Sequence, residues 1–70
     1  MVNIECPMSG KVLEVLVKVG QTIAEDDEVI ILEAMKMENP IFATEGGVVK
    51  EINVKEGQVV ADGDVLVVLE

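Results

Sequence analysis

The sequence predicts an all-β domain, a flattened barrel or sandwich of short strands, and two observations carry that prediction. Twenty of the 70 residues are Val (14) or Ile (6), the β-branched types that favour strands over helices. The chain also aligns with itself, without a gap, when it is shifted by 37 positions, so that Gly10–Glu33 lies on Gly47–Glu70 with eleven identical pairs. Two copies are too few for a solenoid and instead suit one closed domain of two similar halves.

Each half divides into four strands, separated by turn residues such as Pro7-Met8-Ser9-Gly10 and Asp62-Gly63. No stretch remains for a helix, and eight short strands close most simply as a flattened barrel or sandwich. The half-repeats cover about 4–33 and 41–70 of a single domain, residues 1–70, and residues 34–37 are the turn between them. The expected strands are Val2–Cys6, Lys11–Lys18, Thr22–Ile23 and Val29–Glu33, followed by Glu38–Ala43, Val48–Lys55, Val59–Val60 and Val65–Leu69.

The join between the halves is the segment Glu33–Asn39, which places Lys36 between two methionines. Its residues are good helix formers, but seven of them are too few to nucleate a stable helix between two strands. A tight β-turn with Lys36 at its tip is therefore expected. If a two-fold axis relates the halves, this turn and the chain termini lie at opposite ends of the domain.

The run Glu33-Ala34-Met35-Lys36-Met37-Glu38-Asn39 resembles the modification site of biotinyl domains, the carrier modules of biotin-dependent carboxylases and decarboxylases. Pro7–Val12 and Val17–Gln21 are also similar to positions of that family. One departure is Asp26, which stands where many relatives have the glycine that the second half keeps at Gly63. Aspartate tolerates the left-handed conformation, so the turn is expected to survive.

The resemblance implies a barrel-sandwich hybrid, with two four-stranded antiparallel sheets related by a pseudo-two-fold axis. It further implies covalent biotin on Lys36, and recognition of Ala34, Met35, Met37 and Glu33 by a biotin protein ligase. The domain would be a non-catalytic carrier that moves a carboxyl group between the biotin carboxylase and carboxyltransferase, or decarboxylase, subunits of a complex.

Two alternatives remain. A lipoyl carrier domain shares the fold, but its turn typically reads Asp-Lys-Ala, whereas Met35 and Met37 flank the lysine here. An unmodified acidic module that pairs through its strand edges is the second. The sequence offers no acid–base or nucleophile arrangement for an enzyme of its own.

Composition excludes other classes of function. The net charge of −9 would repel nucleic acid and anionic lipid, and no apolar run approaches the roughly 18 residues of a membrane span. With no histidine and one cysteine a zinc site is excluded, and Glu25–Glu28 is expected to be a solvated turn, not a metal site. Cys6 is expected to be a small packed hydrophobe. A single thiol and no signal peptide indicate a cytoplasmic protein.

Overall fold

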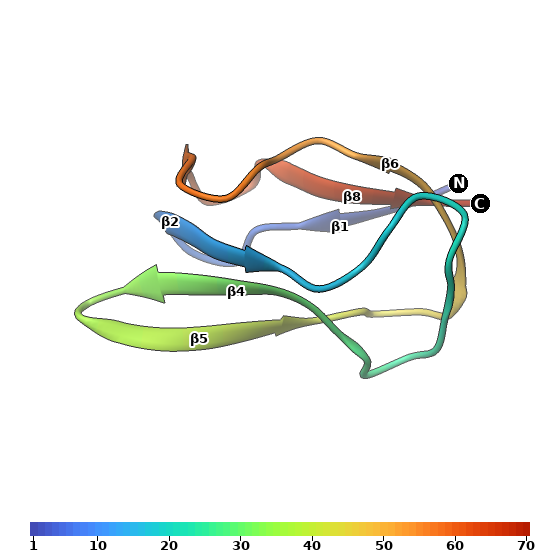
Figure 1. The fold of residues 1–70 in the computed structure, drawn as a ribbon, viewed down its shortest axis with the longest axis horizontal. Helices are drawn as coiled ribbons and strands as arrows, with labels where there is room; N and C mark the ends of the chain where they lie inside the picture. Colours follow the sequence, from blue (N-terminus) through green and yellow to red (C-terminus); the bar gives the residue numbers. More distant parts are fainter.

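The computed structural model describes residues 1–70 and contains eight strands and no helix. The domain is elongated, with extents of 31 × 18 × 18 Å, and its strands form two layers (Figure 1). Because the chain has no helix, it has none that is long and apolar enough to cross a membrane. The strands are β1 (Val2–Glu5), β2 (Gly10–Val15), β3 (Thr22–Ile23), β4 (Glu28–Ala34), β5 (Met37–Phe42), β6 (Gly47–Ile52), β7 (Val59–Val60) and β8 (Val65–Leu69).

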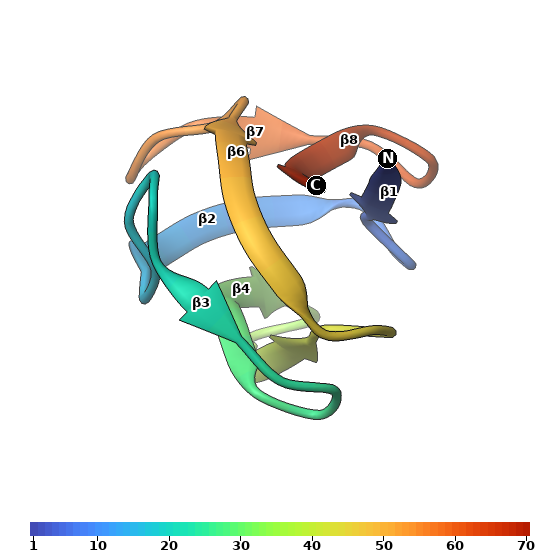
Figure 2. The ribbon, with the colours of Figure 1, turned by 90° about the vertical axis from the view of Figure 1, so that its right-hand side faces the viewer.

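Each layer is a four-stranded sheet in which every pairing is antiparallel. One sheet has the order β1-β8-β6-β3 and the other the order β5-β4-β2-β7. A shift of 37 residues turns β1–β4 into β5–β8, and so turns the first order into the second. Since β3 pairs with β6 and β7 with β2, each sheet takes strands from both halves (Figure 2). The predicted fold class is confirmed, and the two halves are interlocked.

The core consists of 16 buried side chains, all hydrophobic, and no polar side chain is buried with them. Every one of the 16 has its repeat partner, 37 positions away, in the same core. The internal repeat is therefore a repeat of buried positions as well as of residue types. The pairs are Ile4/Ile41, Cys6/Ala43, Val12/Val49, Val17/Val54, Ile23/Val60, Val29/Leu66, Ile30/Val67 and Leu32/Leu69.

A β-bulge in each half allows two consecutive residues to be buried, which plain strand alternation forbids. The register of β4 against β5 slips between Glu28 and Ile30, and both Val29 and Ile30 point into the core. The pairing of β1 with β8 slips at the equivalent place, which buries Leu66 and Val67 together.

The turns of the two halves are held by the same side-chain hydrogen bonds. Gln21 Oε1 accepts from the backbone N–H of Lys18 at 3.0 Å, and Gln58 Oε1 accepts from Lys55 at 3.2 Å. In the next turn of each half, an Asp Oδ2 accepts from the backbone N–H three residues earlier at 2.8 Å; the residues are Asp27 and Asp64. Identical Gln and Asp residues therefore recur because each one closes a turn.

Asp26 occupies the left-handed position that its repeat partner fills with glycine. Its φ is 72°, and the φ of Gly63 is 91°. The expectation that aspartate maintains this turn is confirmed.

The predicted ends of the two long strands are wrong. β2 ends at Val15 and β6 at Ile52, whereas both were expected to continue for three more residues, to Lys18 and Lys55. The chain leaves its sheet at these points and crosses to the other layer, and a valine of each crossing (Val17 and Val54) is buried in the core. The other strand limits differ from the prediction by at most one residue.

Candidate functional site

The hairpin of β4 and β5 projects from one end of the molecule, and both chain termini lie at the other end (Figure 1). The two strands pair from Glu28↔Phe42 up to Ala34↔Met37, which leaves Met35 and Lys36 as a two-residue loop. The expected tight turn with Lys36 at its tip is confirmed, and so is the separation of this turn from the termini.

Both loop residues have the left-handed backbone conformation, with φ of 55° for Met35 and 64° for Lys36. Positive φ at both central positions is the mark of a type I′ turn, whose twist matches the flanking strands and which normally uses Asn and Gly. For other L-residues this conformation costs about 1–2 kcal/mol each. Strain of this kind persists where function requires particular side chains. The sequence gives no sign of it, since neither residue is a typical one for this turn.

Asn39 closes the hairpin from the β5 side. Its Nδ2 donates to the backbone carbonyl of Met37 at 3.1 Å and to that of Ala34 at 3.4 Å. These two carbonyls belong to the pair that flanks the loop, so one side-chain amide joins both ends of the turn. This role was missed in the sequence analysis, which treats Asn39 only as the last residue of the modification motif.

The two methionines beside the lysine are exposed. Met35 is 92% exposed and Met37 is 64% exposed, so neither side chain is packed in the core. Lys36 between them is also exposed, and Ala34 is half-buried. The structure therefore brings an amine and two flexible thioethers together at one tip, with no core for the thioethers to fill.

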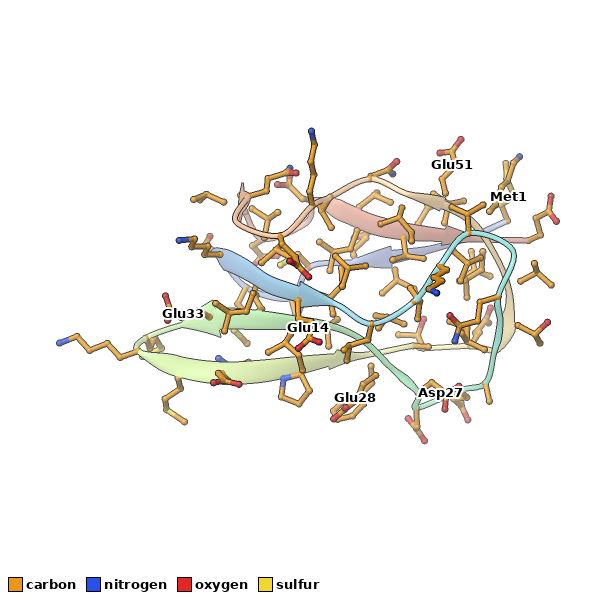
Figure 3. The ribbon with its side chains drawn as sticks, viewed as in Figure 1. Met1, Glu14, Asp27, Glu28, Glu33 and Glu51 are labelled. Carbon is orange, nitrogen blue, oxygen red and sulfur yellow. The ribbon has the colours of Figure 1, made fainter.

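Glu33 is exposed on the outer surface of the same hairpin, one residue before Ala34. Across the sheet it faces Glu38 on one side and Lys11 on the other. Figure 3 shows Glu33 towards the hairpin end and Met1 and Glu51 towards the other end. Like charges directly opposite one another destabilise a strand pair and opposite charges stabilise it, so Lys11 offsets the repulsion between Glu33 and Glu38.

The base of the hairpin is held by a close approach of β2. A Cβ added to Gly10 would lie 2.5 Å from the carbonyl oxygen of Glu33 and 3.0 Å from Leu32 Cγ. Only glycine fits at this distance. The carbonyl of Glu33 is thereby packed against backbone, three residues before the lysine.

The remaining candidate residues lie elsewhere. Cys6 is buried, 2% exposed, and its Sγ donates to the carbonyl of Met8 at 2.6 Å, in agreement with its predicted role as a packed side chain. All four residues of the acidic turn Glu25–Glu28 are exposed to solvent, as expected.

Comparison with known proteins identifies the family to which the chain is similar. The family model described as "Biotin-requiring enzyme" matches residues 2–69. A biotin carboxyl carrier protein of Streptococcus mutans is 56% identical over 41 residues, which are 59% of this chain and 32% of that protein. The gamma subunit of a methylmalonyl-CoA decarboxylase from Veillonella parvula is 46% identical over 46 residues, 66% of this chain and 36% of that one.

Solved structures agree with the sequence comparison. The urea carboxylase of Kluyveromyces lactis contains a region that covers 99% of this chain with a TM-score of 0.92 and 33% identity. A single-chain, multi-domain long-chain acyl-CoA carboxylase matches 94% of it with a TM-score of 0.88 and 30% identity. These matches span 6% and 7% of the two carboxylase chains, and about a third of the two smaller relatives, so this chain corresponds to one part of each.

Proposed function

The chain belongs to the biotin-requiring enzyme family, and we propose on that basis that it is a biotin carboxyl carrier module loaded on Lys36. In this role the domain moves a carboxyl group between the active sites of a biotin-dependent carboxylase or decarboxylase, and has no active site of its own. The partners proposed are a biotin protein ligase and the biotin carboxylase and carboxyltransferase, or decarboxylase, subunits, in the cytoplasm.

The observation that carries the proposal is the placement of one amine. Lys36 stands in a strained two-residue loop, whereas Lys11 and Lys50 lie within strands and Lys18 and Lys55 in turns that glutamine side chains close. The loop is exposed and lies away from the core. It therefore suits an amide bond between Nζ and the carboxyl carbon of biotin, which removes the positive charge of the lysine and releases water.

The residues of this chain then have simple tasks. Bound biotin supplies the chemistry of taking up and releasing the carboxyl group. The type I′ turn and Asn39 hold the lysine backbone in one orientation, and the distance between the turn and the termini leaves the tip free to enter a partner's active site (Figure 1). Met35, Met37, Ala34 and Glu33 are proposed to be the surface that the ligase recognises.

The test is a ligase assay on the purified chain, read by streptavidin blot and by intact mass. The wild-type chain is expected to gain one biotin, and Lys36→Arg none. Lys55→Arg, which keeps the hairpin intact, is the matched control and is expected to be labelled normally. Label on Lys36→Arg, or label lost only in Lys55→Arg, would overturn the assignment.

The same assay separates the alternatives. Modification by a lipoate ligase, with no biotin incorporated, would indicate a lipoyl carrier. An unmodified mass for the native protein from biotin-replete cells would indicate an acidic interaction module. A pull-down with the biotinylated chain then identifies the carboxylase or decarboxylase that it serves.

A further inference from the structure

The outer face of the hairpin-bearing sheet carries apolar side chains that do not belong to the core. In β4, Ile30 and Leu32 are buried, so Ile31 between them points outward. Across the sheet Ile31 faces Pro40 of β5. Neither side chain is among those that pack on the core.

A bulge in β2 extends this row to a third strand. The register of β2 against β4 slips between Val12 and Glu14, which sets Leu13 and Glu14 together opposite Ile31. Val12 is buried and Val15 packs against the core, so both residues between them face outward. Leu13, half-buried, therefore lies beside Ile31 on the outer face.

Phe42 completes what we call the apolar band, the set Leu13, Ile31, Pro40 and Phe42. It lies two residues after Pro40 on the same face of β5, opposite Glu28, and is 48% exposed. Single exposed hydrophobic residues are ordinary, but a connected group across three strands marks an interaction surface.

The other half of the molecule provides an internal comparison. The repeat partners of the band, on the outer face of the second sheet, are Lys50, Val68, Asn3 and Glu5. The same fold thus accepts polar or charged side chains at three of these four positions. An apolar residue there is not required by the scaffold, although Val65, half-buried, does stand where the hairpin sheet has Glu28.

Carboxylates surround the apolar band. Glu14 and Glu28 are its direct neighbours, and Glu33 and Glu38 form the rung between the band and the lysine. Figure 3 shows Glu33, Glu14 and Glu28 in that order from the hairpin end inward. A complementary surface has an apolar centre and a rim of Lys or Arg. A second copy of this chain, with its net charge of −9, lacks that complementarity.

We propose that the apolar band is the docking surface for the ligase that modifies Lys36, an inference that rests on the proposed function. An enzyme that acts on Nζ itself must lie against the hairpin. Pro40 and Phe42 are four and six residues from Lys36, about 14 Å and about 20 Å along the strand. A typical interface buries about 800 Å² on each partner, a patch roughly 30 Å across. A patch of this size that has the turn near one edge and extends along β5 therefore also covers the band.

The test replaces two members of the band by their own repeat partners. Leu13→Lys with Phe42→Glu introduces the residues found at Lys50 and Glu5, so the fold is expected to tolerate them, and the net charge stays at −9. The matched control is Lys50→Glu with Glu5→Lys on the opposite sheet, which also leaves the net charge unchanged. Thermal unfolding of both variants establishes that they are folded.

The expected result is a rise of about tenfold in the ligase KM of the band variant, equivalent to about 1.4 kcal/mol, with kcat within twofold of wild type and the control unchanged. An unchanged KM in the folded band variant would overturn the inference, while normal labelling of Lys36 would leave the proposed function intact. If only carboxylase turnover of the already biotinylated variant falls, the band binds a carboxylase subunit, and its assignment to the ligase is wrong. A wild-type chain that is not labelled at all overturns both.

Discussion

The two ends of this molecule are built from the same strand pair, and only one of them is closed. At the hairpin end β4 and β5 are joined by Met35 and Lys36. At the other end β8 and β1 pair in the equivalent register, Leu69 with Val2 where the hairpin has Leu32 with Asn39, and no loop joins them. The strand pair therefore forms without a turn. The strained turn is an addition to the scaffold, and its energetic cost is consistent with the proposed modification of Lys36.

Truncating one core leucine at each end tests whether the two halves contribute equally to the free energy of unfolding. Leu32 and Leu69 are both 0% exposed and are repeat partners. Leu32→Ala and Leu69→Ala are each expected to lower the free energy of unfolding by about 3 kcal/mol, as transfer and cavity terms predict. Urea denaturation measures both. A difference between them of more than about 1 kcal/mol would show that one end dominates the stability of the fold.

The two close glycines are expected to differ, because the space for a Cβ is smaller at Gly10 than at Gly47. A Cβ at Gly10 would lie 2.5 Å from the carbonyl of Glu33, and one at Gly47 would lie 2.8 Å from the carbonyl of Glu70. The next nearest atom is Leu32 Cγ at 3.0 Å for Gly10, and Leu69 Cβ at 3.4 Å for Gly47. Gly10→Ala is therefore expected to cost about 2 kcal/mol and Gly47→Ala about 1 kcal/mol, measured by the same denaturation. Equal losses would contradict the view that the closer contact at Gly10 is the more costly one.

Much of this architecture follows from the sequence, because buried positions recur at one fixed spacing. The apolar residues of Val29–Leu32 and Leu66–Leu69 align, and alignment of the halves predicts the all-strand fold, the turn and the opposite placement of the termini. The family resemblance added the arrangement of two four-stranded sheets.

Other features depend on contacts between distant segments. Pairing of β2 with β7 and β3 with β6 joins residues some 50 and 25 positions apart, a distance over which local patterns carry no information. The positive φ values at Met35 and Lys36 could not be predicted, because methionine and lysine rarely adopt the left-handed conformation. The outward direction of Leu13 depends on a bulge that alternation alone does not reveal.

Replacement of the strained loop by residues that favour it separates stability from function. Met35→Asn with Lys36→Gly introduces the preferred type I′ pair. The variant is expected to gain about 1 kcal/mol in stability by relief of the left-handed strain, and to lose modification because the amine is gone. Met35→Asn alone, which keeps the lysine, is the control and is expected to gain part of the stability. Loss of stability in the double variant would show that the methionine and lysine backbones are not strained.

The smallest effect is expected at Asn39. This residue closes the hairpin, and the equivalent position at the other end of the molecule has a different side chain. Its repeat partner is Val2, which packs against the core, so Asn39→Val copies a residue that the fold already contains at the open end. The change removes the hydrogen bonds to the carbonyls of Met37 and Ala34. Since these bonds are at the surface, we expect a loss of about 0.5 kcal/mol in global stability. Amide hydrogen exchange at residues 35–37 is expected to become faster, while exchange at the β1–β8 pair stays the same. Unchanged exchange in the loop would mean that strand pairing alone, without Asn39, orients Lys36.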